Sequence, residues 1–255
     1  MASPAPWGTG ASSGPRQAPE EVRAATRQPL SARSARPRSD VGLLIAGIVG
    51  FIVVGVAIAL VVSYLGLVLG GPIFLVAGIL ALIPLVIVLL GARWIDRWEP
   101  EPVGILIFAF LWGAGSSIVI ALLVDSAAQI FVKAQGGANG VTDLVQAVVQ
   151  APMVEEGAKG LGVLLIFLVA NKYFDGPVDG IAYAVTIAAG FAFSENIQYF
   201  GLAIANPHET VGGVVQLFVF RGIMSPFAHA MFTSMTGLFI GLAASRGDRW
   251  LGVVF

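Results

Sequence analysis

Residues 41–65 read VGLLIAGIVGFIVVGVAIALVVSYL and contain no charged side chain. A helix needs about 20 mostly apolar residues to cross a bilayer, so this stretch is long enough to form a transmembrane helix. The whole chain has the same character, since 57% of its 255 residues are hydrophobic and 11% are charged. A soluble domain carries about 25% charged residues. The sequence therefore predicts an integral membrane protein, an all-α polytopic bundle of transmembrane helices.

Apolar stretches of similar length recur along the chain. Six spans are expected, at 41–65, 70–91, 103–128, 145–170, 180–203 and 213–243. Pro226 interrupts the last one, and because proline lacks a backbone N–H, this span is expected to be kinked or broken. Residues 250–255, WLGVVF, are apolar but too short to cross. They indicate a seventh helix cut at the end of the chain, so that six to seven spans are predicted.

The first forty residues have a different composition. They are rich in Pro, Ala, Ser and Arg and poor in large apolar residues, which is typical of a disordered segment. The sequence thus predicts a disordered basic tail at 1–40 and a transmembrane domain at 41–255. The tail lacks the apolar stretch of a cleaved signal peptide. We expect a solvated tail, with contact to anionic lipid as the alternative.

Basic residues indicate how the chain is oriented. If the N-terminus is cytoplasmic, eleven Lys and Arg residues lie in cytoplasmic segments and only Lys133 lies in an outer loop. Such an excess predicts a multi-pass protein of the cell membrane with its N-terminus in the cytoplasm. The net charge of −1 does not indicate a nucleic-acid partner. The absence of cysteine excludes disulfides, thiol catalysis and thiolate metal sites.

Three ionisable side chains are expected at one depth in the membrane. Counted along their helices, Glu155, Glu195 and His229 each lie about 21–22 Å from the cytoplasmic end of a predicted span. A charge inside a bilayer costs at least about 2.5 kcal/mol, so such groups normally face the bundle interior and have a use. Asp125 lies near the outer end of its helix, where it can reach water, and Arg221 is expected to make a structural ion pair.

Helical spacing groups the charged residues of the fourth span. Lys159 follows Glu155 by four residues and Glu156 by three, so either carboxylate can meet its ammonium group. The two glutamates are about 100° apart around the axis and cannot face the same way, which favours different roles. A Glu–Lys pair that only holds the helices together is the structural alternative. For His229 the structural alternative is a hydrogen bond between helices.

Two carboxylates, an amine and an imidazole in an apolar bundle can perform acid–base chemistry. Glu155 or Glu156 could take a proton from a water molecule that attacks a peptide carbonyl, and His229 could stabilise the oxyanion or protonate the leaving amine. Glu195 would position the water or share a proton. The sequence contains neither H-E-x-x-H nor G-x-S-x-G, and no aspartate pair at matched depth. A proton- or cation-coupled transporter and a non-catalytic membrane scaffold remain the alternative functions.

Four blocks of the sequence resemble the PrsW family of glutamic-type intramembrane proteases, which is related to the CAAX prenyl endopeptidase group. These blocks are DRWEPEP at 96–102, VEEGAKGL at 154–161, DGPVDGIAYAVTIAAGFAFSEN at 175–196 and SPFAHAMFT at 225–233. They resemble the loop after the family's second helix, its E-E-x-x-K motif, its F-x-x-x-E motif and its histidine motif. The four blocks occur in order and within a membrane region, which makes the resemblance specific.

The resemblance implies proteolysis of membrane-protein substrates, with anti-sigma factors as one substrate class. It implies an active site of Glu155, Glu156, Glu195 and His229, with Lys159 and Asn196 in support. Two glutamates and a histidine could hold a metal ion, but the resemblance favours a metal-free, Glu-activated water, so no cofactor is expected. The expected partners are a membrane-protein substrate and the lipid bilayer.

Overall fold

A computed structural model describes residues 40–137 and 139–245. The chain divides into the units Met1–Asp40 and Val41–Phe255, and only the second is described below. The predicted disordered tail at 1–40 lies outside the described residues except for Asp40, and the predicted start of a seventh helix at 250–255 lies wholly outside them. Every described element is helical, which confirms the all-α prediction for the described part of the chain.

The described helices follow one another with short connections. They are α2 (Asp40–Leu69), α3 (Gly71–Asp96), α4 (Val103–Leu111), η1 (Trp112–Ser117), α5 (Ile118–Ala134), α6 (Gly140–Val145), η2 (Gln146–Gln150), α7 (Ala151–Val169), η3 (Asn171–Tyr173), α8 (Pro177–Ala205), α9 (Val211–Leu217), η4 (Phe218–Met224) and α10 (Ser225–Ser245). The segments η1, η2 and η4 are π-helical, and each continues the α-helices on either side of it. Such π-helical segments occur frequently at functional sites.

Five helices are long and apolar enough to cross a membrane: 41–69, 71–96, 103–134, 177–205 and 211–245. These coincide with five of the six predicted spans. The sixth prediction, 145–170, falls on the continuous helix formed by α6, η2 and α7, whose apolar part carries Glu155, Glu156 and Lys159. Because of these three charges, this helix is not among the five that are apolar enough to cross a membrane. The chain is thus a multi-pass bundle, and six to seven spans stay a prediction.

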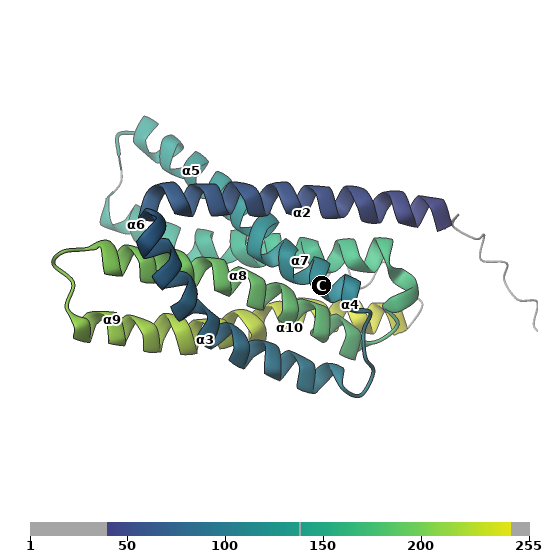
Figure 1. Cartoon of the computed structure of the whole chain (residues 1–255). Coiled ribbons are helices and arrows are strands. Elements are labelled where there is room, and N and C mark those ends of the chain that lie inside the picture. The colour runs from purple at the N-terminus through teal and green to yellow at the C-terminus, as the bar shows by residue number, and fades with distance from the viewer. Residues whose placement is uncertain (1–39, 138, 246–255) are drawn as a thin grey trace, which may run out of the picture. The chain divides into compact units, whose positions relative to one another are not determined.

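Helix α8 forms the core of the bundle. Of the most apolar 18-residue stretch of this span, 78% is buried, whereas the buried share is at most 44% in the corresponding stretches of the other four described spans. Helices α3, α4, α7 and α10 pack around it together with η1, and Figure 1 shows α8 in green with α10 beside it. The large apolar side chains that α2 and α3 leave exposed suit contact with lipid. Two of the site residues predicted from the sequence, Glu195 and Asn196, lie on this buried helix.

Glycines allow α8 and α10 to approach closely. A Cβ atom added to Gly180 would lie 2.0 Å from the carbonyl oxygen of Gly237, and one added to Gly237 would lie 2.1 Å from that of Gly180. Only glycine fits at either position, because any side chain would overlap the opposite backbone. Small residues at helix crossings are the usual way to obtain tight packing in membranes, where the hydrophobic effect does not drive helices together. This contact fixes the helix that carries His229 against the helix that carries Glu195.

Candidate active site

Helix α7 brings Glu155, Glu156 and Lys159 into the bundle, and its position is fixed by η1. The indole Nε1 of Trp112 donates a hydrogen bond to the carbonyl oxygen of Ala158 at 3.0 Å, and Ser117 Oγ donates to the same oxygen at 3.3 Å. Helix α7 therefore crosses η1 one residue before Lys159, whose side chain is fully buried.

Helix α8 is anchored to the same π-helical segment. Ser194 Oγ donates a hydrogen bond to the carbonyl oxygen of Ala114 at 2.7 Å. The residue after Ser194 is Glu195, which is 9% exposed. One turn earlier, Phe191 is buried, with the Lys159 ammonium 3.9 Å from the centroid of its ring and the His229 ring 5.4 Å away in an edge-on arrangement. Phe191 therefore contacts two of the charged groups, as well as preceding Glu195 in the F-x-x-x-E motif.

The last described span contributes His229 and Thr233 from α10, and Arg221 from η4. The sequence analysis expected this span to be kinked or broken at Pro226, and the helix continues through Pro226 without a break. Pro226 lies at the second residue of α10, directly after the π-helical turn Phe218–Met224. A π-helical turn changes the hydrogen-bond pattern along the backbone, which lets the helix continue past a residue that lacks an N–H.

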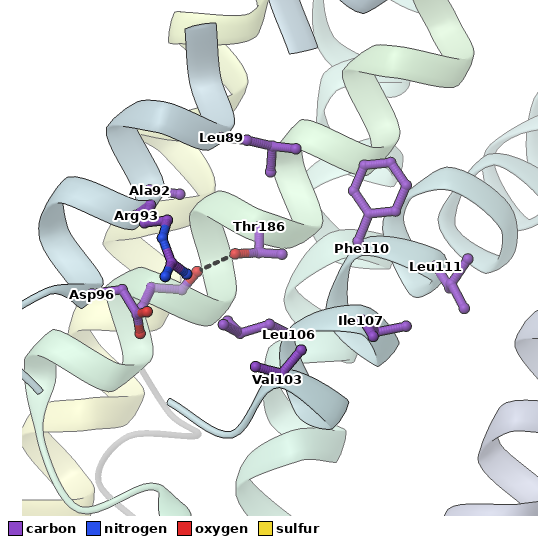
Figure 2. A pocket seen from close by; sticks show the side chains of 11 residues that line it. Leu89, Ala92, Arg93, Asp96, Val103, Leu106, Ile107, Phe110, Leu111 and Thr186 are labelled. Carbon is purple, nitrogen blue, oxygen red and sulfur yellow. Dashed lines mark hydrogen bonds between the residues drawn. The ribbon is translucent and has the colours of Figure 1, made fainter. Parts of the chain in front are cut away.

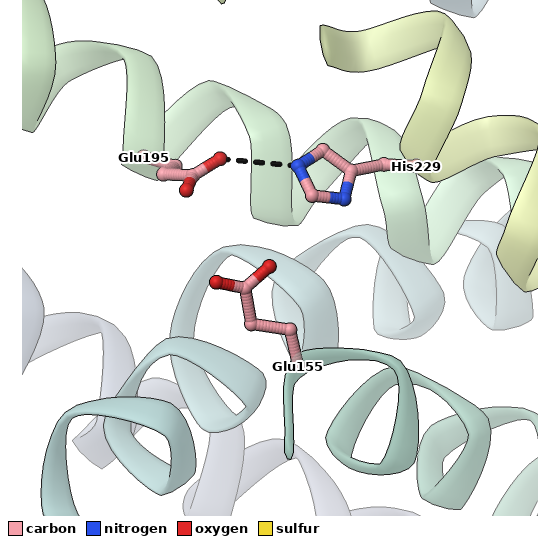
Figure 3. Close-up of side chains that lie close together, drawn as sticks. All are labelled: Glu155, Glu195 and His229. Atoms are coloured by element: carbon pink, nitrogen blue, oxygen red, sulfur yellow. Dashed lines mark hydrogen bonds and ion pairs between the residues drawn. The ribbon is translucent and has the colours of Figure 1, made fainter. Parts of the chain in front are cut away.

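Glu155, Glu195 and His229 meet at one point although they come from three different helices (Figure 3). Each offers one oxygen or ring nitrogen, and these atoms all lie within 4.8 Å of one another. His229 Nε2 lies 3.1 Å from Glu195 Oε2. The three side chains that the sequence analysis assigned to one depth are therefore neighbours in the structure.

The adjacent glutamates have different surroundings, as their angular separation predicts. Glu156 Oε1 accepts a hydrogen bond from Lys159 Nζ at 2.7 Å, and Oε2 accepts one from Thr233 Oγ1 at 2.8 Å. Both oxygens of Glu156 are thus engaged by the protein. For Glu155 the described contacts include only an ion pair with Lys159 at 3.9 Å. Its carboxylate is consequently the freer of the two to bind a water molecule.

Lys159 determines which nitrogen of His229 carries the proton. Lys159 Nζ lies 2.7 Å from His229 Nδ1, and an ammonium group can only donate. The Nδ1 atom then accepts this hydrogen bond, which places the proton of the neutral ring on Nε2. That N–H points at Glu195 Oε2, the acceptor at 3.1 Å. A chain of hydrogen bonds therefore runs from Glu156 through Lys159 and His229 to Glu195.

Arg221 belongs to the same cluster, which the sequence analysis did not expect. Its Nη2 atom donates to Glu195 Oε1 at 2.6 Å, and its guanidinium group lies 3.5 Å from the centroid of the Tyr199 ring. The expected structural ion pair exists, but its partner is a predicted site residue. The spacing of eight residues between Arg221 and His229 could have indicated one helix face. The π-helical turn between them alters this periodicity, so the sequence alone gave no reliable position.

Asn196 is placed differently from the other predicted residues. It is 2% exposed, and its Nδ2 atom is buried without a hydrogen-bond partner among residues 40–137 and 139–245. Its side chain has no described contact with Glu155, Glu195 or His229. A supporting role for Asn196 therefore stays a prediction.

A cavity of about 260 Å³ adjoins the cluster and lies between α5, α7 and α8. Glu155, Glu195 and Phe191 line it on the side of the cluster, together with Asp125, Gln150, Gln198, Tyr199 and several small or apolar side chains. A larger cavity of about 330 Å³ lies between α3, α4 and α8, and Figure 2 shows its mostly apolar lining. None of the residues lining it belongs to the cluster, so the smaller cavity is the relevant one for chemistry.

The donor set of the cluster also suits a divalent metal ion. Carboxylate oxygens and imidazole nitrogens are both zinc ligands, and a catalytic zinc site combines three protein ligands with one position open for water. Glu155, Glu195 and His229 supply these atoms within 4.8 Å of one another. To bind a metal through Nε2, His229 would have to carry its proton on Nδ1. Glu156 Oε1, 3.5 Å from Nδ1, could accept that proton's hydrogen bond.

Comparisons with known proteins identify the family of the chain. The family model described as PrsW family intramembrane metalloprotease matches residues 101–255. The chain is 34% identical over 172 residues to Protease PrsW of Clostridioides difficile (strain 630), with 67% of each chain aligned. It is 30% identical over 150 residues to Protease PrsW of Geobacillus kaustophilus (strain HTA426), with 58% of each aligned.

A third relative, Protease PrsW of Bacillus subtilis (strain 168), is 27% identical over 157 residues. The alignments thus span 58–67% of the length of these three relatives. No solved structure matches the chain. The family model covers more than half of the chain and contains all three residues that meet in the cluster. This chain is therefore a member of the PrsW family of intramembrane proteases.

Proposed function

We propose that this protein hydrolyses peptide bonds of membrane proteins, within or next to the membrane, by means of a water molecule activated by a glutamate. One observation carries the proposal. Glu155, Glu195 and His229 converge from three helices, and the two glutamates line a cavity large enough for part of a peptide. Carboxylates in a bilayer are costly, so their convergence beside a cavity favours a chemical role over a purely structural one.

Glu155 is the proposed general base. It lines the cavity, and its carboxylate has fewer protein partners than that of Glu156. It would take a proton from water while the water oxygen attacks the carbonyl carbon of the substrate. The C–N bond then breaks, and the proton passes to the leaving nitrogen. Glu195 would position the water, in line with its place opposite Glu155 in the cluster.

Glu156 and Lys159 are proposed to hold the site rather than to react. Glu156 is held by Lys159 and Thr233, and Lys159 in turn contacts His229 Nδ1. This arrangement keeps the His229 proton on Nε2, where it can be donated to the oxyanion of the tetrahedral intermediate. Lys159 also supplies a positive charge that favours the ionised form of the glutamates.

The family description names a metalloprotease, and the residues present fit a metal, as set out above. A bound divalent cation would supply a water of lowered pKa and a positive charge for the oxyanion. Glu155, Glu195 and His229 would hold it. The 2.7 Å contact between Lys159 and His229 Nδ1 favours the tautomer with the proton on Nε2, which cannot ligate through that atom. We therefore propose the metal-free mechanism, and measurement of bound metal in active protein tests it.

The proposed substrates are membrane proteins, with anti-sigma factors as one class. We also propose a cell-membrane location with a cytoplasmic N-terminus, supported by the excess of Lys and Arg in the corresponding loops.

The decisive experiment uses purified protein in detergent or liposomes with a panel of single-span substrates. We expect cleavage by the wild type and a loss of about 10²–10⁴-fold in kcat/KM for Glu155→Gln, because a general base contributes a factor of this size. Glu209→Gln, an exposed glutamate outside the cluster, is the matched control and should retain activity. Full cleavage by a folded Glu155→Gln variant would contradict the assignment of the base. Absence of cleavage together with cation flux in the liposomes would indicate a transporter instead.

A further inference from the structure

The cavity beside the cluster has a polar side that the proposed chemistry does not use. Asp125 on α5, Gln150 at the end of η2, and Gln198 on α8 line it together with the two glutamates. Apolar side chains, among them Leu122 and Val154, complete the wall. The cavity thus combines hydrogen-bonding groups with apolar surface next to the atoms proposed to react.

Its size suits part of a polypeptide. A cavity of about 150 Å³ in a protein can hold a benzene molecule, so about 260 Å³ has room for a long side chain and adjoining backbone. The primary amides of Gln150 and Gln198 can each donate to a peptide carbonyl and accept from a peptide N–H. A lining with two amides and three carboxylates suits a peptide better than a lipid acyl chain.

The charges in the cavity are unequally compensated. Glu195 forms an ion pair with Arg221 at 2.6 Å, and Glu155 forms a longer one with Lys159 at 3.9 Å. Asp125 accepts a hydrogen bond from the neutral amide of Gln129 at 2.8 Å. Among the described residues that line the cavity, none is basic. Within residues 40–137 and 139–245 the half-buried carboxylate of Asp125 has no ion-pair partner, and it faces this space.

We propose that this cavity binds the substrate segment next to the cleaved bond and that Asp125 pairs with a Lys or Arg side chain of that segment. The proposal rests on the proposed proteolytic function and specifies one feature of its substrates. The long apolar stem of a lysine would lie along Leu122 and Val154, while its ammonium group reaches Asp125. The enzyme would thus prefer substrates with a basic residue close to the scissile bond.

The test compares matched single-span substrates that differ at one position beside the cleaved bond, which carries Lys, Met or Glu. For the wild type, kcat/KM should be about tenfold higher for Lys than for Met, as expected for one partly buried charge pair. In Asp125→Asn this ratio should approach one, mainly through KM. In Asp125→Lys the preference should shift to Glu. Asp143→Asn, an exposed acid on α6 away from the cavity, is the control and should keep the wild-type ratio.

Binding is measured separately from cleavage, in the Glu155→Gln background with and without Asp125→Asn. Cleavage without a Lys preference, or with a preference that Asp125→Asn leaves unchanged, overturns the cavity proposal and leaves the proteolytic function intact. Lys-selective binding that Asp125→Asn abolishes, in a protein that cleaves nothing, overturns the proteolytic function and retains the basic-residue site. Circular dichroism confirms that each variant is folded.

Discussion

Glu101, in the loop between α3 and α4, is expected to make the stability of the protein depend on pH. Its side chain is 9% exposed. Burial is the main cause that raises its pKa from the ordinary value of 4.5 to about 7, and the nearby carboxylates of Asp179 and Asp96 raise it further. The hydroxyl group of Tyr183 donates a hydrogen bond to Glu101 and acts in the opposite direction.

The magnitude follows from this shift in pKa. One pKa unit corresponds to 1.36 kcal/mol, so a rise from 4.5 to about 7 corresponds to about 3 kcal/mol between the two protonation states. Because the folded-state pKa is raised, the stabilising effect of the protonated group is fully present below pH 4.5 and is lost as the pH rises through about 7. The free energy of unfolding therefore decreases between pH 4.5 and about 7, and at pH 8 it is lower by the full cost of burying the ionised carboxylate.

The perturbation is Glu101→Gln, which keeps the shape of the side chain and an oxygen that can accept from Tyr183. We expect the variant and the wild type to have similar free energies of unfolding near pH 4.5. At pH 8 the variant should be more stable by up to about 3 kcal/mol, because it has no charge to bury. The measurement is reversible unfolding by SDS titration in mixed micelles, followed by circular dichroism at several pH values.

Glu99→Gln, an exposed carboxylate in the same loop, is the matched control and should follow the wild-type pH dependence. If the wild type and Glu101→Gln lose stability in parallel between pH 4.5 and 8, burial of the Glu101 carboxylate does not cause the pH dependence, and the raised pKa of Glu101 is contradicted.

Two further predictions concern helix packing and the cluster. Arg221→Gln removes the ion pair with Glu195 and should lower kcat about tenfold or more while changing KM less. The reason is that a misplaced Glu195 affects the reacting water rather than substrate binding. Steady-state kinetics separate the two constants. Arg221→Lys should restore only part of the rate, because an ammonium group cannot reproduce the stacking on Tyr199. Gly180→Ala should destabilise the bundle by about 1–3 kcal/mol or more, since the new methyl group would overlap the Gly237 carbonyl oxygen. SDS titration tests this, with Gly78→Ala as the control, because a Cβ atom there meets nothing within 4 Å.

Much of the fold follows from composition and from local helical geometry. In a bilayer, the backbone N–H and C=O groups of an uncharged stretch such as 41–65 find hydrogen-bond partners within the stretch only if it is helical. The positions of five spans therefore follow directly from the sequence. The same reasoning identified 145–170 as a span, but α7 carries three charges there, so this stretch is not among the five helices found apolar enough to cross a membrane. Of the kink or break expected at Pro226, the break is absent, because a π-helical turn, which propensity does not reveal, precedes the proline and the helix continues.

The candidate groups of the site can be identified from the sequence alone. Counting along helices assigned Glu155, Glu195 and His229 to one depth, because the rise per residue of a helix is fixed. The separation of Glu155 and Glu156 around the axis likewise predicted that their carboxylates have different surroundings.

The partners of each group on other helices follow only from the packing of the bundle, because contacts between helices depend on how the helices are rotated and how closely they approach. The glycine contact between α8 and α10 and the hydrogen bonds from η1 to Ala158 set these rotations. They direct Glu156 to Lys159 and Thr233, leave Glu155 at the cavity, and add Arg221 to the cluster. Helical spacing along α7 already allows the contact between Glu156 and Lys159. The contacts of Thr233 with Glu156 and of Arg221 with Glu195 join different helices, so no periodicity along a single helix contains them.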